Sequence, residues 1–151
     1  MKDTGIAAEH VFCKKFKAKH ITDKKLQYRD IDAQLPDGRY VSIKNQEMST
    51  KTGNFSFETE LISTSTGKSM DGNFYNCDAE VYAILAGGVW YIFRSQDLHK
   101  YFDTYKSTFR YVKTSHYTEE ANRRLGRYYD RAMNYLIPVK DLKPIALKIC
   151  K

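Results

Sequence analysis

Residues 28–44 read Tyr28-Arg-Asp-Ile-Asp-Ala-Gln-Leu-Pro-Asp-Gly-Arg-Tyr-Val-Ser-Ile-Lys44. Polar and apolar residues alternate over positions 30–35 and again over 41–44, as in strands that bury one face. The two runs are separated by Pro-Asp-Gly, which is typical of a tight turn. We therefore expect a short β-hairpin here.

The register of this hairpin follows from the length of its loop. A three-residue loop pairs Leu35 with Arg39, and antiparallel partners share a face of the sheet. The remaining pairs are then Ala33 with Val41, Ile31 with Ile43, Asp32 with Ser42, and Asp30 with Lys44. One face is apolar, and the other gathers two carboxylates, a serine and a lysine. A solvated sheet face is the plain alternative to a chemical site.

Composition limits the class of protein. A chain of 151 residues with 42% hydrophobic content is long and apolar enough for one folded domain spanning 1–151. It contains no run near the roughly eighteen apolar residues of a membrane span, and its first residues do not read as a signal peptide. Three widely spaced cysteines favour reduced thiols in the cytoplasm and no zinc site.

The charge balance is basic. Lys and Arg number 25 against 18 Asp and Glu, which gives a formal net charge of +7 and an isoelectric point near 9.2. Such a charge favours association with polyanions such as nucleic acids, although many basic proteins bind none.

The N-terminal segment has helical periodicity. Asp3 or Thr4 can cap a helix whose apolar stripe contains Ile6, Phe12, Cys13 and Phe16. Glu9 lies in the middle of that stripe. A carboxylate on a buried face is costly unless it is paired or bound to a metal, so either a buried salt bridge or a role in a site would explain it.

Further elements follow along the chain. Gly53-Asn54 is a turn signal before an ordered element that begins at Phe55. Residues 63–73 are polar and read as a surface loop, and 78–85 and 89–93 read as strands joined by a Gly87-Gly88 turn. Ser95 is expected to cap a helix over 96–101.

The C-terminal third offers a basic surface. Thr118 can cap a helix with an apolar stripe that includes Ala132 and with four arginines opposite, namely Arg123, Arg124, Arg127 and Arg131. Those arginines could contact phosphates or could be a solvated face. Lys113 belongs to a stretch that alternates charges with tyrosines, a pattern suited to single-stranded nucleic acid. His20 and His116 have no evident partners and are read as surface histidines.

The order of these features resembles the PD-(D/E)xK nuclease superfamily, most of all its small phage and prokaryotic nucleases and junction resolvases. The residues that carry the likeness are Glu9 on a helix, Asp32, Ser42-Ile-Lys44, Glu58 after Gly53, and a strand starting at Asp78. The likeness covers about residues 3–103, and residues 136–142 look like the usual late strand and helix start. It implies a restriction-endonuclease-like α/β fold with a central mixed sheet of four to five strands flanked by helices.

One residue departs from the family pattern. The family usually has an acid two positions before the lysine, where this chain has Ser42. A subgroup of restriction endonucleases has serine there and takes the acid from a later element, with thirteen residues intervening after the lysine; thirteen residues also separate Lys44 from Glu58. The resemblance thus makes Glu58 a candidate ligand, with Glu47 and Glu60 as lesser ones. A decayed site that only binds is the alternative.

The resemblance implies hydrolysis of phosphodiester bonds with Mg²⁺ or Mn²⁺ as cofactor. Asp32 and Glu58, with Glu9 and the Ile43 carbonyl, would hold the metal ion, which lowers the pKa of bound water. Lys44 would position the attacking water and contact a phosphate oxygen, leaving a 5′-phosphate on the product. Ser42 and Gln46 would orient the ligands through hydrogen bonds.

The expected function is therefore a magnesium-dependent endonuclease acting on DNA, with branched and single-stranded DNA as candidate substrates. A catalytically inactive nucleic-acid-binding or inhibitor module on the same fold is the alternative, and a structural phage protein without nucleic-acid affinity is a third reading. The resemblance favours a homodimer located in the cytoplasm, that of a bacterial host if the chain is phage-encoded.

Overall fold

The computed structural model describes residues 4–115 and 131–151. His116 and the expected helix start at Thr118 lie outside these ranges. No helix within them is both long and apolar enough to cross a membrane.

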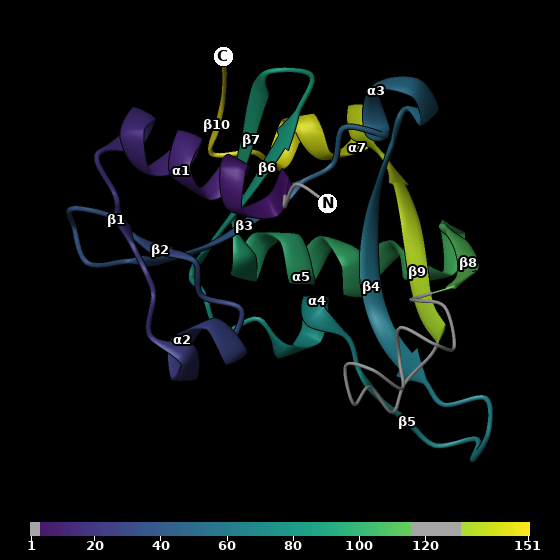
Figure 1. The fold of residues 1–151 in the computed structure, drawn as a ribbon. Helices are drawn as coiled ribbons and strands as arrows, with labels where there is room; N and C mark the ends of the chain where they lie inside the picture. Colours follow the sequence, from purple (N-terminus) through teal and green to yellow (C-terminus); the bar gives the residue numbers. More distant parts are fainter. Residues whose placement is uncertain (1–3, 116–130) are drawn as a thin grey trace.

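The described residues form short helices around two β-sheets (Figure 1). The helices are α1 (Thr4–Phe16), α2 (Lys24–Tyr28), α3 (Ser49–Thr52), α4 (Asn73–Asn76), α5 (Ser95–Tyr105) and α7 (Val139–Leu142), with 3-10 turns η1 (Lys106–Thr108) and η2 (Lys143–Ile145). The strands are β1 (Lys19–His20), β2 (Ala33–Gln34), β3 (Tyr40–Asn45), β4 (Asn54–Ile62), β5 (Ser69–Asp71), β6 (Val81–Ala86), β7 (Val89–Arg94), β8 (Arg110–Ser115), β9 (Arg131–Pro138) and β10 (Lys148–Cys150).

The first sheet is mixed, and the second is antiparallel. The first has six strands in the order β1-β2-β3-β6-β7-β10, in which only β3 and β6 run parallel. The second has four strands in the order β5-β4-β9-β8. This confirms an α/β protein with a mixed sheet, but the strands divide between two sheets and do not form one sheet of four to five.

A core between the two sheets explains this division. Along β4, Phe55 and Phe57 are buried on one face, and both pack with Tyr82 of β6 and with Leu98 and Phe102 of α5. The apolar face of β4 is therefore satisfied by packing against the first sheet, while its backbone pairs with β9.

The opposite face of the first sheet is covered by α1. Phe12 packs with Val41 and Ile43 of β3 and stacks edge-on against Trp90 of β7, with ring centroids 5.2 Å apart. The helix expected near the N-terminus is confirmed. Ile6, however, is 46% exposed, so the buried stripe runs through Ala8 and Phe12.

The expected hairpin is confirmed at its tip. Ala33 pairs with Val41, and the Leu35 amide donates to the Arg39 carbonyl at 2.9 Å across the three-residue loop. The ladder between β2 and β3 covers only two residue pairs and ends at Ala33. The Asp32 amide still donates to the Val41 carbonyl at 2.9 Å, so the chain leaves β3 only before Asp32, which changes where Asp30 points.

The second expected hairpin is confirmed, but the prediction that Ser95 caps the helix after it is wrong. Strands β6 and β7 are joined at Gly87 and Gly88, which have φ of 59° and 73°, the left-handed values that a tight turn needs. Ser95 lies inside α5 and not before it, because Arg94 occupies the N-cap without a side-chain cap bond. The helix extends to Tyr105, four residues further than expected.

Gly72 allows α4 to approach β4 closely. A Cβ atom at this position would lie 2.7 Å from the Glu58 carbonyl oxygen, which is shorter than any tolerable contact. The Gly72 amide donates to the Thr59 carbonyl at 3.0 Å, beside a register shift in the β4–β9 pairing between Glu58 and Glu60. A larger residue would push α4 away from Glu58.

The late strand and helix start are confirmed by β9 and α7, but the helix expected to carry Ala132 on its apolar stripe and Arg131 on its opposite face is wrong at these two residues. Both residues begin β9, which pairs with β4 on one side and β8 on the other. A strand with neighbours on both sides satisfies its backbone in the sheet, and this pairing overrides the local helical spacing.

Candidate functional site

The polar face of β3 carries the central contact of the site. Ser42 and Lys44 lie beside Tyr82 and Ile84 of the parallel strand β6, on the face opposite Val41 and Ile43. Lys44 Nζ lies 2.6 Å from Asp30 Oδ1, and the Ser42 hydroxyl donates to Asp30 Oδ2 at 2.8 Å. The expected strand pairs of Asp30 with Lys44 and of Asp32 with Ser42 are not formed, because the ladder ends at Ala33. The side chains of Asp30 and Lys44 nevertheless meet, and Ser42 contacts Asp30 in place of Asp32.

Burial does not neutralise Lys44. Removal from water opposes its charge, but the Asp30 and Asp32 carboxylates favour it, and the pKa of the ammonium group lies above its ordinary value. Burial raises the pKa of Tyr82 as well. Lys44 is therefore a charged donor held between a carboxylate and the core.

Asp32, just before β2, is bonded to the backbone of β3. Its Oδ2 accepts a hydrogen bond from the Ile43 amide at 2.7 Å. Burial raises the pKa of Asp32 to about 6, against the lowering effects of that hydrogen bond and of Lys44, and the charges of Asp30 and Glu9 raise it further. The carboxylate is ionised at neutral pH but at a cost, because burial and like charges both disfavour it.

Glu9 reaches the site from α1. Its Oε1 lies 3.0 Å from His20 Nε2 on the edge strand β1, and both side chains are largely buried, with 14% and 25% exposed. The reading of His20 as a surface histidine without a partner is wrong, because the fold brings β1 against α1. Glu9 is thus partnered by His20, in a contact that is a salt bridge only when the imidazole is protonated, and Glu9 also acts electrostatically on Asp32.

Cys77 borders the site from the segment after α4. Burial raises its pKa to about 11, and the charge of Asp30 adds to the effect. Such a shift favours the protonated thiol over the nucleophilic thiolate at neutral pH.

Glu58 comes from the other sheet. It lies on β4 next to the register shift, and its Oε1 accepts a hydrogen bond from the Asn73 amide at the start of α4, at 3.3 Å. The charged groups that act on Asp32 are Lys44, Asp30 and Glu9. Assignment of Glu58 to a shared metal ion stays a prediction.

The donors around Asp32 have the chemistry that Mg²⁺ prefers, namely carboxylate and carbonyl oxygens. Over residues 4–115 and 131–151, no three His, Cys, Asp or Glu side chains are arranged to hold a metal ion among themselves. Mg²⁺ is commonly bound through one or two carboxylates together with water and substrate phosphates, so a complete protein cage is not required. The residues present fit a site that substrate completes.

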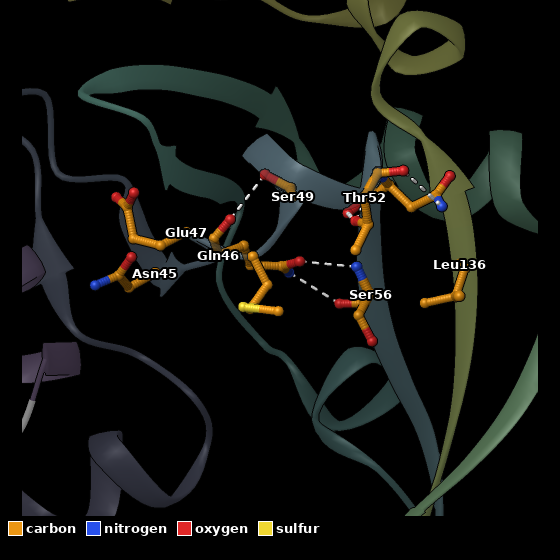
Figure 2. Close-up of a pocket in the computed structure, with 9 residues that line it drawn as sticks. Asn45, Gln46, Glu47, Ser49, Thr52, Ser56 and Leu136 are labelled. Carbon is orange, nitrogen blue, oxygen red and sulfur yellow. Dashed lines mark hydrogen bonds between the residues drawn. The ribbon is translucent and has the colours of Figure 1, made fainter.

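Gln46 is bonded to β4 of the second sheet. Its side chain accepts a hydrogen bond from the Ser56 amide at 2.7 Å and donates to the Ser56 carbonyl at 2.8 Å, as Figure 2 shows. Gln46 therefore ties the end of β3 to β4, where we had expected it to orient metal ligands. Beside it lies a pocket of about 500 Å³ lined by Asn45, Gln46, Glu47, Met48, Ser49, Thr52, Asn54, Ser56 and Leu136.

The candidate nucleic-acid residues are only partly described. Lys113 lies exposed on β8, and Arg131 begins the neighbouring strand β9. Arg123, Arg124 and Arg127 fall outside the described residues. Because Arg131 begins a strand, it does not share a helical face with the other three arginines.

Sequence reasoning did not assign Asp30 to the site. The alternation that placed Asp30 opposite Lys44 was a usable signal, but the family pattern drew attention to Asp32 alone. The contact to Ser42 could not be read from spacing, because it depends on the chain leaving β3 before Asp32.

Comparison with protein-family models gives no match, and comparison with curated proteins gives none either.

Proposed function

We propose that this chain is a magnesium-dependent endonuclease that hydrolyses phosphodiester bonds in DNA. The observation that carries the proposal is that groups from separate segments act on the Asp32 carboxylate, namely Glu9 from α1, Asp30 from the chain before β2 and Lys44 from β3, with Lys44 in contact with Asp30.

The charge balance of this cluster supports a bound cation. The charges of Asp30 and Glu9 both disfavour the ionised form of Asp32, while the charge of Lys44 favours it. A divalent cation would relieve the remaining repulsion and would favour the ionised form of Asp32. The positive net charge of the whole chain, +7, suits a DNA substrate.

Each residue has a role in the proposed reaction. Asp32 would hold Mg²⁺, with Glu9, the Ile43 carbonyl and Glu58 as further oxygen donors. When bound, the ion supplies a water of lowered pKa and screens charge on the phosphate. Lys44 would donate a hydrogen bond to a phosphate oxygen as negative charge develops there.

A catalytically inactive nucleic-acid-binding or inhibitor module is the second candidate. It is favoured by the 2.6 Å contact between Lys44 and Asp30, which occupies the lysine, and by Ser42 at the position where the family has an acid. An ion pair of this kind can hold a fold together without any reaction.

Cleavage assays separate the two candidates. Supercoiled, single-stranded and branched DNA would each be incubated with the protein and Mg²⁺, Mn²⁺ or EDTA. We expect metal-dependent nicking that falls by about 100- to 1,000-fold in Asp32→Asn and Lys44→Met, the scale for losing one group that stabilises the transition state. Asp78→Asn, which removes a solvent-exposed partner of Arg29, is the matched control and should cleave like the wild type.

Two other outcomes would reject the proposal. Salt-sensitive DNA binding with no cleavage of any substrate would assign the chain to the inactive module. Cleavage that persists in both Asp32→Asn and Lys44→Met would place the reaction elsewhere in the molecule.

A further inference from the structure

Asp30 occupies an unusual position at the end of α2. The Asp30 amide donates to the Gln27 carbonyl at 3.0 Å, and the Ile31 amide donates to the Leu26 carbonyl at 3.1 Å. Leu26 and Ile31 also pack together in one small core cluster. These two hydrogen bonds and the apolar contact define a Schellman motif, in which Asp30 is the residue just after the cap.

That position requires a left-handed backbone. Asp30 has φ of 59°, and helices that end in this way usually have glycine there. Asparagine and aspartate are the side chains that tolerate this conformation best. Because glycine is the common choice at this position, the contacts of the Asp30 carboxylate should explain why an aspartate is found here.

The side chain crosses to the polar face of β3. One oxygen contacts Lys44 Nζ and the other accepts the Ser42 hydroxyl, at 2.6 and 2.8 Å. Only 16% of the Asp30 side chain and 21% of the Lys44 side chain are exposed. Both oxygens are therefore engaged in a largely dry contact, unlike those of an exposed surface pair.

Ser42 is too short to supply a carboxylate itself. It lies two residues before Lys44 on the same face of β3 and is fully buried. Through its hydroxyl it holds the Asp30 carboxylate beside Lys44, in the region that an acid at position 42 would reach. The carboxylate next to Lys44 therefore comes from Asp30.

We propose that Asp30 is the positioning residue for Lys44, and that it supplies from the cap of α2 the negative charge that Ser42 does not provide. This inference rests on the proposed nuclease function for its catalytic meaning. Asp30 acts through Lys44: it orients the ammonium group next to Asp32, where a scissile phosphate would lie. Glu58, whose carboxylate contacts the Asn73 amide, is not needed for this task.

The test moves the carboxylate back to β3. Asp30→Gly removes it and suits the left-handed backbone, and Asp30→Asn keeps the shape without the charge. Asp30→Gly combined with Ser42→Asp returns a carboxylate to the strand. Asp78→Asn serves as the control because it removes the charge of an aspartate from a different ion pair near α2, that of Asp78 with Arg29, whose side chains are about half exposed.

Two readouts are needed. The first is the Lys44 ammonium signal in the ¹H–¹⁵N NMR spectrum of the metal-free protein, which persists only when its protons are bonded and shielded from exchange. The second is the rate of DNA cleavage with Mg²⁺. We expect Asp30→Gly and Asp30→Asn to lose the signal and to cleave about 10- to 100-fold more slowly, the scale for groups that orient a catalytic side chain. The combined variant should recover both.

Three other results would decide against the inference or against the proposed function. An unchanged Lys44 signal and unchanged cleavage in Asp30→Asn would overturn the inference while leaving the nuclease proposal intact. Recovery of the signal without recovery of cleavage would show that Asp30 does more than position Lys44, and would also overturn it. If the wild type cleaves no DNA, the proposed function fails, and loss and recovery of the signal alone decide whether Asp30 replaces the charge missing at Ser42.

Discussion

The two faces of β3 are stabilised in different ways. On one face, Val41 and Ile43 are buried beneath α1, where Phe12 and Trp90 pack against each other. On the other face, Ser42 and Lys44 are bonded to Asp30. Contacts on the first face are apolar and need no particular orientation, whereas those on the second depend on direction and charge.

This difference means that the two faces should respond to different variables. The apolar face should contribute the same stability at any pH or metal concentration. Stability from the polar face should change with protonation of its acids and with bound cations. Substitutions on the same strand can therefore test whether the polar face is built for structure or for chemistry.

The largest loss of stability is expected on the apolar face. Ile43→Ala should lower the free energy of unfolding by about 3 to 4 kcal/mol, because it leaves a cavity under α1. Urea denaturation at pH 5 and pH 8, with and without Mg²⁺, should give the same loss each time. A loss that varies with pH would show that the two faces are coupled.

A somewhat smaller loss is expected from breaking the ion pair. Lys44→Met should destabilise the protein by about 3 kcal/mol, because the Asp30 charge is left without its cation in a largely buried place. The double variant with Asp30→Asn should recover most of this loss. Asp78→Asn in the exposed pair with Arg29 should cost less than about 1 kcal/mol. Equal losses for the two pairs would contradict the distinction between them.

The smallest effect is a gain of stability. The pKa of Asp32 is about 6 in the folded protein, above the ordinary value of 3.8. Folding is therefore favoured by protonation: the contribution is fully present below about pH 4 and is lost as the pH rises through 6. By pH 8 the ionised carboxylate costs about 2 kcal/mol, allowing for partial solvation. Asp32→Asn should recover that amount at pH 8.

The same variant has a built-in control. At pH 3.5, where the wild-type carboxyl is protonated, Asp32→Asn should unfold at the same urea concentration as the wild type. Mg²⁺ at pH 8 should stabilise the wild type and not the variant, which would reduce the difference between their free energies of unfolding. A gain that is constant across pH would mean that the Asp32 charge is not costly in the folded protein.

Local patterns predicted several elements correctly. Helix α1, the hairpin tip between β2 and β3, and the β6–β7 hairpin at Gly87-Gly88 are confirmed, because alternation, helical periodicity and turn residues are properties of neighbouring positions. The strand β9 was in part misread as a helix, because its pairing with β4 and β8 joins residues distant in sequence. The contact of Glu9 with His20 was missed for the same reason.

The candidate site shows the same limit. Spacing placed Asp30 opposite Lys44 in a strand pair that is not formed, although the two side chains do meet. It did not reveal the hydrogen bond to Ser42, nor that Gln46 binds Ser56 on another strand. The expected sheet of four to five strands became two sheets, since the apolar face of β4 packs across a shared core.

The amino-acid sequence alone determined which residues of β3 would be apolar and which polar, because successive side chains of a strand point to opposite faces. It also determined a turn at Pro36-Asp37-Gly38 and a basic chain. The tertiary structure decided that the hairpin ladder stops at Ala33 and that the end of α2 turns Asp30 towards Lys44. The left-handed backbone at Asp30 and the packing of α2 set the direction of that carboxylate, and neither is a property of sequence spacing.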